Sequence, residues 1–262
     1  MKSGALSAQT VTQAPKAAVI VGASAGVGRA LAAELAQRGW ALVLCATDAR
    51  DLGALAEDLR LRFGARVAVL VSDLAAPDFN AEALAQACAK AAPVPVEALL
   101  LAAGIADAER DSRLEETDVL ERLARVNYLS AIAAARAFAR RYEAQGRGTI
   151  VGFSSIAAHA PRRRNMVYAS AKAGLESYFG SLRHYFAGTP VRVQCYALGY
   201  VDTALSYGQK LPLPAAAPRR VARRIAEGLG RDVGLCFEPR YWGAITAALR
   251  LLPWPVYRRL KF

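Results

Sequence analysis

Short, continuous apolar runs alternate with segments of helical spacing along most of this chain. The runs that we expect to form strands cover residues 17–22, 41–46, 66–71, 96–102, 148–153, 191–197 and 234–237. Between them, apolar residues recur every three to four positions, which predicts helices over residues 26–38, 52–62, 81–91, 118–144, 165–187 and 218–229. Uninterrupted apolar strands are typical of a parallel sheet covered on both faces. The alternation predicts an α/β fold with a doubly wound parallel sheet, in which ligands bind beyond the carboxyl ends of the strands.

The 262 residues contain no internal repeat and no linker long enough to separate two domains. We therefore expect a single catalytic domain over residues 17–240. Residues 1–16 lack both helical spacing and the features of a signal peptide, and we interpret them as a flexible N-terminal arm. Residues 241–262 mix apolar, aromatic and basic side chains and form a basic, apolar C-terminal extension.

The cysteines and histidines bear on the compartment and on metal binding. The four cysteines lie far apart and form no CxxC pair, which favours free thiols in a reducing, cytoplasmic compartment over a disulfide framework or a zinc site. Only two histidines are present, so we expect no metal centre.

The formal net charge is +12, and only six of the 34 basic residues are lysines. A basic surface attracts nucleic acid, anionic lipid or phosphorylated substrates, and it is also consistent with plain solvated surface. The arginines are scattered and no nucleic-acid-binding motif is present, so we expect no nucleic-acid partner.

A glycine-rich turn follows the first expected strand. The segment Gly22-Ala23-Ser24-Ala25-Gly26-Val27-Gly28 leads directly into a helix. Glycines there allow a tight turn and a close approach of backbone to a pyrophosphate, and the start of the helix offers free N–H groups. The spacing GxxxGxG differs from the GxGxxG fingerprint, but its position between a buried strand and a helix favours dinucleotide binding over a plain turn.

Tyr168 and Lys172 lie four residues apart in an expected helix, which places them on one face. A lysine cation favours phenolate, so we expect a lowered tyrosine pKa and an acid/base role. Tyr257 and Lys261 repeat this spacing in the basic tail. Ser155 precedes Tyr168 by thirteen residues at the end of a strand and distinguishes the first pair as catalytic.

Taken in order, these motifs resemble the short-chain dehydrogenase/reductase family over residues 17–237. The resemblance implies a Rossmann-like single domain, binding of NAD(P)(H), assembly into a homo-oligomer, and hydride transfer between a carbonyl and an alcohol. It implies a catalytic tetrad of Asn127, Ser155, Tyr168 and Lys172. The implied cofactor contacts, which share the carboxyl ends of the strands, are Gly22, Ser24, Gly26, Val27, Gly28, Thr47, Asp73, Leu74, Ala103, Gly104, Tyr168, Lys172, Gly199, Val201 and Thr203.

Three positions depart from the family pattern without removing a catalytic group: Val21 replaces a threonine, Ala102 an asparagine and Leu198 a proline. The choice between NAD and NADP stays open in the sequence. Neither an acid at Ala46 nor a base at Thr47 follows the second strand, and Asp48 is displaced by two positions. Asp73 suits an adenine contact and a simple turn equally well.

Two features suggest the substrate. Arg162, Arg163 and Arg164 precede Tyr168 and suit a phosphate, although a solvated basic loop fits the spacing as well. Tyr207 lies in an apolar loop after Thr203 and is a further candidate contact. The tail has the composition of a segment that contacts anionic lipid at the inner face of the membrane, or alternatively one that packs on a neighbouring subunit.

Within the family, three segments are similar to the branch of decaprenylphosphoryl-2-keto-ribose reductases: residues 124–131, residues 154–175 and the tail from Trp242. This resemblance implies a keto-sugar on a polyprenyl phosphate as substrate. The alternatives are a reductase of 3-oxoacyl thioesters or small ketones, and a non-catalytic NAD(P)-binding regulator.

Overall fold

The computed structural model describes residues 16–206, 208 and 211–260. Seven parallel strands form one sheet in the order β3-β2-β1-β4-β5-β6-β7. The strands are β1 Ala17–Val21, β2 Ala41–Ala46, β3 Val67–Val71, β4 Val96–Leu101, β5 Gly148–Ser155, β6 Val191–Leu198 and β7 Gly234–Glu238. The longer helices are α1 Gly26–Gln37, α2 Ala49–Phe63, α3 Ala81–Ala91, α4 Thr117–Ala124, α5 Ser130–Gln145, α6 Met166–Tyr185, α7 Pro218–Gly228 and α8 Tyr241–Arg250. The doubly wound α/β fold predicted from the alternating pattern is confirmed.

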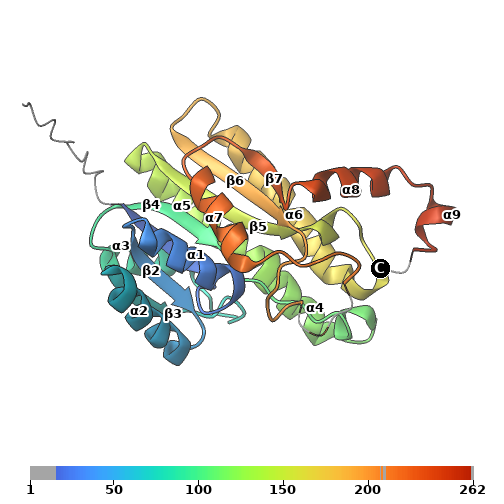
Figure 1. Ribbon diagram of the computed structural model, residues 1–262, viewed down its shortest axis with the longest axis horizontal. Helices are drawn as coiled ribbons and strands as arrows, with labels where there is room; N and C mark the ends of the chain where they lie inside the picture. The colour runs from blue at the N-terminus through green and yellow to red at the C-terminus, as the bar shows by residue number, and fades with distance from the viewer. Residues whose placement is uncertain (1–15, 207, 209–210, 261–262) are drawn as a thin grey trace, which may run out of the picture.

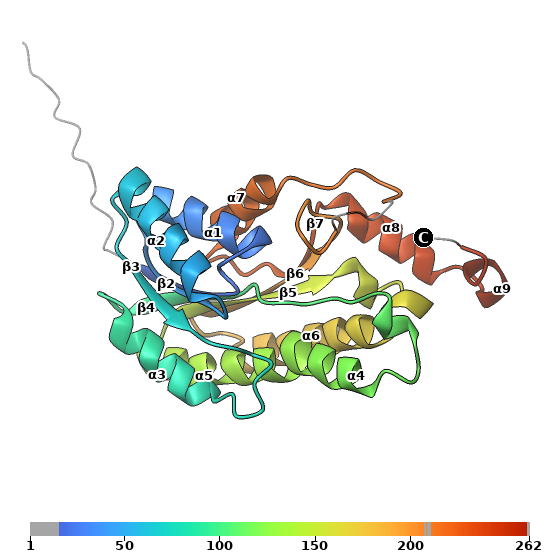
Figure 2. The ribbon, with the colours of Figure 1, turned by 90° about the horizontal axis from the view of Figure 1, so that it is seen from below.

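The helices form one layer on each face of the sheet (Figures 1 and 2). Helices α1, α2 and α7 cover one face, and α3 to α6 cover the other. Alternate residues of each central strand pack into the two layers: Val19 joins the core cluster under α5 and α6, whereas Ile20 joins the cluster under α1 and α7. Burial on both faces explains why β1, β2 and β4 are almost continuously apolar in sequence.

Strand register brings distant segments together at the carboxyl edge of the sheet. Val21 at the end of β1 pairs with Leu101 at the end of β4, so the glycine turn lies beside the loop that follows β4. Ser155 pairs with Leu198, which places the end of β5 next to Gly199. The strand order reverses between β1 and β4, and a crevice at such a reversal is where doubly wound sheets bind their ligands.

Two helical regions differ from the expected ones. The helix expected over residues 118–144 is divided by a π-helical turn, Arg125–Leu129, between α4 and α5. The C-terminal extension, expected from composition alone, contains α8 and a short helix α9, Trp254–Tyr257, which reach outward beyond the end of the sheet (Figure 1). Over the described residues, no helix has the length and apolar character that spanning a membrane requires. The N-terminal arm lies outside the described residues, apart from Lys16.

Candidate active site

The glycine turn is held against the loop after β4. The backbone N–H groups of Gly22 and Ala23 both donate to the carbonyl oxygen of Cys45 in β2, at 2.7 and 3.1 Å. Gly22 has a φ of 84°, and a Cβ atom there would lie under 3.0 Å from the backbone of Ala103. A Cβ on Gly28 would meet the Gly22 carbonyl equally closely. Only glycine fits these positions, so the turn keeps its backbone exposed to a ligand at the start of α1.

Ser24, Gly26 and Val27 complete this turn. The carbonyl oxygen of Ser24 accepts a hydrogen bond from Arg29 Nε at 2.9 Å. Gly26 has a φ of 51°, and a Cβ there would lie 3.2 Å from the Thr203 methyl group. The glycine turn and the loop after β6 are therefore in close contact, and the cofactor roles of Gly26 and Thr203 stay predictions.

Asn127 lies in the π-helical turn and is completely buried. Its Nδ2 donates to the carbonyl oxygens of Ile105 and Leu123, at 2.8 and 3.0 Å, and its Oδ1 accepts from the Ile105 N–H at 3.3 Å. A Cβ on Gly104 would lie 3.2 Å from this Oδ1 and 3.4 Å from Lys172 Nζ. The structure thus brings Gly104, Asn127 and Lys172 together, and the side chain of Asn127 fixes the loop after β4.

The tyrosine, serine and lysine converge between β5 and α6. Lys172 is buried, and its Nζ lies 5.7 Å from the centre of the Tyr168 ring. The same Nζ donates to the Phe153 carbonyl oxygen at 2.9 Å. Ser155 and Tyr168 share a side-chain hydrogen bond. The three groups predicted from spacing therefore form one cluster at the carboxyl end of β5.

The expected lowering of the tyrosine pKa is wrong for this arrangement. Burial raises the pKa of Tyr168, and the hydrogen bond with Ser155 opposes this only in part. Burial also lowers the pKa of Lys172 to about 8, from an ordinary value of 10.5. Loss of hydration disfavours the charged form of both groups, and it is the largest cause of both pKa shifts. The protonated form of the Tyr168 hydroxyl is accordingly favoured.

The loop after β6 forms the opposite wall. The Gly199 N–H donates to the Glu238 carbonyl oxygen at 2.9 Å, and Val201 is buried and pairs with Ala216 in an isolated bridge. Trp242 of α8 is buried against Gly199, where any Cβ atom would overlap the indole ring. The first helix of the C-terminal extension is therefore packed on the site wall. Tyr207, the candidate substrate contact, lies outside the described residues.

The candidate contacts for the adenine and its ribose lie in the loops that follow β2 and β3. The carboxylate of Asp73 accepts from the Ala75 N–H at 2.8 Å, which is the geometry of a turn. The carbonyl oxygen of buried Leu74 accepts from Ser130 Oγ at 2.7 Å. Thr47 is exposed at the end of β2, and Asp48 caps α2 by accepting from the Asp51 N–H at 2.9 Å. The displaced acid is thus engaged by its own helix.

The arginine loop lies just before α6. Arg163 and Arg164 are exposed, and Arg162 is partly buried. The hydroxyl of Tyr257 in α9 donates to the Pro161 carbonyl oxygen at 2.8 Å. Lys261, the other member of the second tyrosine–lysine pair, lies outside the described residues. The Tyr257 hydrogen bond connects the tail to the arginine loop.

One residue at the site, Asp111, could not be predicted from the sequence. Asp111, in the loop after β4, is buried and accepts hydrogen bonds from the backbone of Val167 and Tyr168. Its position depends on a contact between residues more than fifty positions apart, which helical spacing and motif order do not reveal.

A glycine turn between β1 and α1, together with a Ser-Tyr-Lys cluster at the end of β5, is typical of oxidoreductases that bind a nicotinamide dinucleotide. Residues 16–210 match the family model described as short chain dehydrogenase, and the chain belongs to that family. It is 33% identical over 244 residues to an uncharacterized oxidoreductase of Mycobacterium tuberculosis, covering 92% of this chain and 96% of that protein. It is 32% identical to cis-4-hydroxycyclohexanecarboxylate dehydrogenase of Sinomonas cyclohexanicum, over 80% of this chain and 82% of that one.

Solved structures agree with this assignment. A short-chain dehydrogenase from Sphingobium yanoikuyae in complex with NADPH superposes with a TM-score of 0.75 at 25% identity, covering 94% of this chain and 96% of that chain. An alcohol dehydrogenase from Thermococcus sibiricus complexed with 5-hydroxy-NADP gives a TM-score of 0.72 at 25% identity, over 85% and 95% of the two chains.

Proposed function

We propose that this protein reduces a carbonyl, or oxidises the corresponding alcohol, with NAD(P)(H) as cofactor and Tyr168 as the acid/base. The observation that carries the proposal is the cluster of Tyr168, Ser155 and Lys172 at the carboxyl end of β5, in which Lys172 is buried and Tyr168 and Ser155 are half-buried. When bound, the nicotinamide supplies or accepts the hydride. Tyr168 donates a proton to the substrate oxygen as negative charge develops there, and Ser155 orients that oxygen by hydrogen bonding.

Lys172 and Asn127 support this proton transfer. The Nζ atom of Lys172, fixed by Phe153, lies on the side of Tyr168 that faces Gly104 and Asn127. From there it can donate a hydrogen bond to a ribose hydroxyl. Asn127 holds the loop after β4 beside the cluster through its two hydrogen bonds with the backbone of Ile105.

The crevice fits a dinucleotide because its glycines bring backbone close to where a pyrophosphate would lie, with Gly22, Gly26 and Gly28 at the start of α1. The remaining members of the predicted set follow the carboxyl ends of β1, β2, β3, β4 and β6: Val27, Thr47, Asp73, Leu74, Ala103, Gly199, Val201 and Thr203. We expect NADPH to be accepted, because no acid at Ala46 or Thr47 would oppose a 2′-phosphate and Asp48 is engaged in capping α2. The ratio of kcat/KM for NADPH and NADH measures this preference.

For the substrate, we propose a keto-sugar carried on a polyprenyl phosphate. Arg163 and Arg164 lie exposed within one helical turn of α6, where guanidinium groups can bind phosphate. The Tyr257–Pro161 hydrogen bond places the C-terminal extension beside this arginine loop. A phosphate group and an apolar chain would therefore meet adjacent surfaces of the protein.

The C-terminal extension is the proposed point of contact with an anionic membrane surface. Leu251 is 84% exposed and Trp254 is 68% exposed, and both lie between Arg250 and Arg258. Residues 241–260 contain no acidic side chain. Exposed apolar and aromatic groups among arginines match the chemistry of an interfacial anchor.

Vesicle sedimentation tests the membrane contact. We expect binding to vesicles with anionic lipid, weaker binding to neutral vesicles, and loss of binding in the double variant Leu251→Ser/Trp254→Ser. The matched control is Leu61→Ser, at an exposed leucine of α2 far along the chain. Equal binding of the double variant and wild type would contradict the membrane contact and favour packing of the tail on another subunit.

Homo-oligomer formation is a further part of the proposal. Leu120, Leu129 and Tyr185 are exposed on the layer formed by α4, α5 and α6. Light scattering of the purified protein distinguishes an oligomer from a monomer of 27.9 kDa.

A substrate panel tests the reaction itself. The panel comprises a polyprenyl-phosphoryl 2-keto-pentose, a 3-oxoacyl thioester and 4-oxocyclohexanecarboxylate, each with NADH and with NADPH. The third compound is the ketone that corresponds to the alcohol named for the Sinomonas cyclohexanicum relative. We expect the highest kcat/KM for the lipid-linked sugar. Turnover of only the other compounds would overturn the substrate, and cofactor binding without turnover of any carbonyl would favour a non-catalytic regulator.

A further inference from the structure

Helix α6 carries Tyr168 in its first turn but lacks a cap of its own. The residue before the helix, Asn165, forms no side-chain hydrogen bond to the first turn. The N–H groups of the first turn of a helix have no partner within the helix and require one from elsewhere. Two of these groups belong to Val167 and to Tyr168 itself.

The partner comes from a loop more than fifty residues earlier. Asp111 Oδ1 accepts from the Val167 N–H at 2.8 Å, and Oδ2 accepts from the Tyr168 N–H at 3.0 Å. Asp111 is only 3% exposed. A buried carboxylate with both oxygens on adjacent backbone N–H groups is a charge-assisted, bidentate contact at the positive end of a helix.

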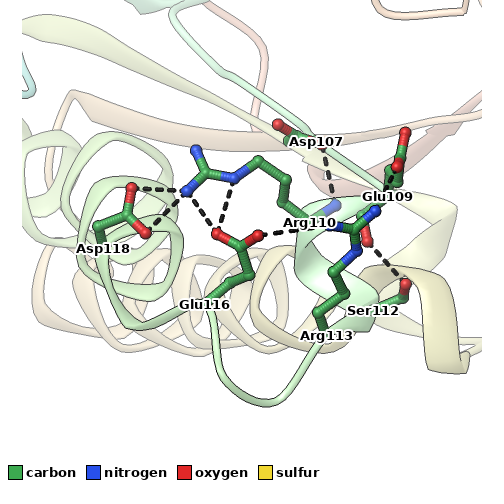
Figure 3. A network of polar contacts seen from close by, with 7 residues as sticks. All are labelled: Asp107, Glu109, Arg110, Ser112, Arg113, Glu116 and Asp118. Carbon is green, nitrogen blue, oxygen red and sulfur yellow. Dashed lines mark hydrogen bonds and ion pairs between the residues drawn. The ribbon is translucent and has the colours of Figure 1, made fainter.

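The loop that holds Asp111 is itself fixed by ion pairs (Figure 3). Arg110 donates to Glu116 through Nε at 2.9 Å and reaches both carboxylate oxygens of Asp118 in α4, at 2.8 and 2.7 Å. Asp107 accepts from the Arg110 N–H at 3.1 Å, and its carbonyl accepts from the Asp111 N–H at 2.8 Å. These contacts surround Asp111 in sequence and turn its side chain away from solvent, toward α6.

We propose that Asp111 is a positioning residue that sets the place of the Tyr168 hydroxyl relative to Ser155. Ser155 belongs to β5 and is fixed by the sheet, whereas Tyr168 belongs to the first turn of a helix, the part that frays most easily. Two hydrogen bonds to Asp111 hold this turn, and one of them is donated by the backbone N–H of Tyr168. The inference rests on the proposed role of Tyr168 as acid/base.

Asp111 also joins the two sides of the site. Its loop continues from Gly104 and Ile105, which contact Asn127 beside the cofactor crevice. The segment from Gly104 to Asp111 therefore contacts Asn127 at one end and the backbone of Tyr168 at the other. A misplacement of about 1 Å of a reacting group can cost roughly 100-fold in rate, which makes such a contact a determinant of kcat.

The test compares Asp111→Asn and Asp111→Ala with Asp58→Asn. Asp58→Asn makes the same chemical change at an aspartate of α2 whose side chain is 46% exposed and pairs with Arg62 of the same helix, on the face of the sheet opposite α6. Asp111→Asn preserves volume and one acceptor oxygen, so it protects the test against a failure of the alanine variant to fold. Carbonyl reduction is measured with 4-oxocyclohexanecarboxylate and with the polyprenyl-phosphoryl keto-pentose, and cofactor binding by quenching of protein fluorescence with NADPH.

We expect kcat to fall roughly 10-fold in Asp111→Asn and roughly 100-fold in Asp111→Ala, with the NADPH dissociation constant within about twofold of wild type. The solvent deuterium isotope effect on kcat should rise in both variants, because proton transfer from Tyr168 becomes slower. A purely structural role would reduce the active fraction and leave the isotope effect unchanged. Asp58→Asn should retain the wild-type kcat and isotope effect.

Wild-type kcat in Asp111→Asn and Asp111→Ala, or a lower kcat with an unchanged isotope effect, would overturn the positioning role. Tyr168→Phe separates this failure from failure of the proposed function. An inactive Tyr168→Phe beside unaltered Asp111 variants removes only the inference, whereas an active Tyr168→Phe removes the acid/base mechanism as well. Amide hydrogen exchange provides a readout without substrate: exchange at Val167 and Tyr168 should accelerate in Asp111→Ala and not in Asp58→Asn, and unchanged exchange in Asp111→Ala would also overturn the proposal.

Discussion

The Nζ atom of Lys172 donates a hydrogen bond to the carbonyl oxygen of Phe153 across 2.9 Å. This contact ties α6 to the end of β5, and it places an amine in a buried environment that lowers its pKa to about 8. The amine is therefore close to losing its charge at neutral to mildly alkaline pH. Its position is suited to exchanging a proton with a bound hydroxyl group.

The first prediction concerns pH and stability. Between pH 8 and 10.5 the unfolded chain keeps Lys172 protonated while the folded chain has begun to release the proton. The unfolded state then binds more protons, so the contribution of Lys172 to the free energy of unfolding rises with pH. The cost of burying the charged lysine is largest below pH 8. Across this pH range, the free energy of unfolding of wild type should rise by up to about 3 kcal/mol relative to that of Lys172→Met.

Urea denaturation of both proteins from pH 7.5 to 10 measures this difference, and the pairing cancels the buried thiols and tyrosines that also titrate at alkaline pH. Lys90→Met, at an exposed lysine of α3, is the matched control. A constant difference between wild type and Lys172→Met over this range would show that the lysine is not desolvated as the structure indicates.

The second prediction concerns the proton donor. Tyr168→Phe should lower kcat by roughly 100- to 10,000-fold and leave the dissociation constant of the cofactor nearly unchanged, because it removes only the hydroxyl that exchanges a proton. Steady-state kinetics and fluorescence quenching by NADPH measure the two effects. Tyr185→Phe, at an exposed tyrosine near the other end of α6, should keep wild-type activity. Activity in Tyr168→Phe within tenfold of wild type would sink the mechanism.

The third prediction concerns the glycine turn. Gly22→Ala forces a Cβ atom into the backbone of Ala103 at a φ of 84°, and should weaken cofactor binding while lowering the free energy of unfolding by about 1–3 kcal/mol. Gly53→Ala, in the middle of α2 with open space around it, should raise stability by about 0.5–1 kcal/mol without affecting the cofactor. Isothermal titration and thermal unfolding test the pair. Normal cofactor affinity in Gly22→Ala would contradict the close approach seen at the crevice.

The fourth prediction concerns the π-helical turn. Asn127→Ala leaves the buried polar groups of Ile105 without their side-chain partner and should cost about 1–3 kcal/mol of stability together with most of the activity. Asn80→Ala removes the cap of α3 and should cost about 1 kcal/mol with no change in kcat. Denaturant titration and initial rates separate the two variants. Equal kcat in both would assign Asn127 a role in stability alone.

Much of the fold could be predicted from the apolar pattern. Strand β2 and helix α3 begin and end at the expected residues, because burial on both faces of a parallel strand and on one face of a helix leaves a direct trace in residue type. The division of α4 from α5 could not be predicted. Its π-helical turn depends on the contact between Asn127 and Ile105, twenty-two residues away, and the helical spacing continues through it.

The candidate cluster could be predicted because the motifs occur along the chain in the same order as the elements that carry them. Ser155 ends β5, and Tyr168 and Lys172 lie in α6 at a fixed spacing. The direction of the tyrosine pKa was not accessible. Spacing places a cation near a phenol, but the balance between attraction and lost hydration depends on how deeply both groups are buried, and burial follows from packing.

The sequence by itself therefore determined the doubly wound sheet and the identity of the groups that meet at its carboxyl edge, since strand periodicity and local spacing are properties of neighbouring residues. Only the tertiary structure decided how Tyr168 is held. The carboxylate of Asp111 reaches the first turn of α6 from a loop more than fifty residues earlier, and Tyr257 reaches Pro161 from the far end of the chain. Such contacts form when the chain packs, because a hydrogen bond between distant segments depends on their meeting in space and leaves no local pattern.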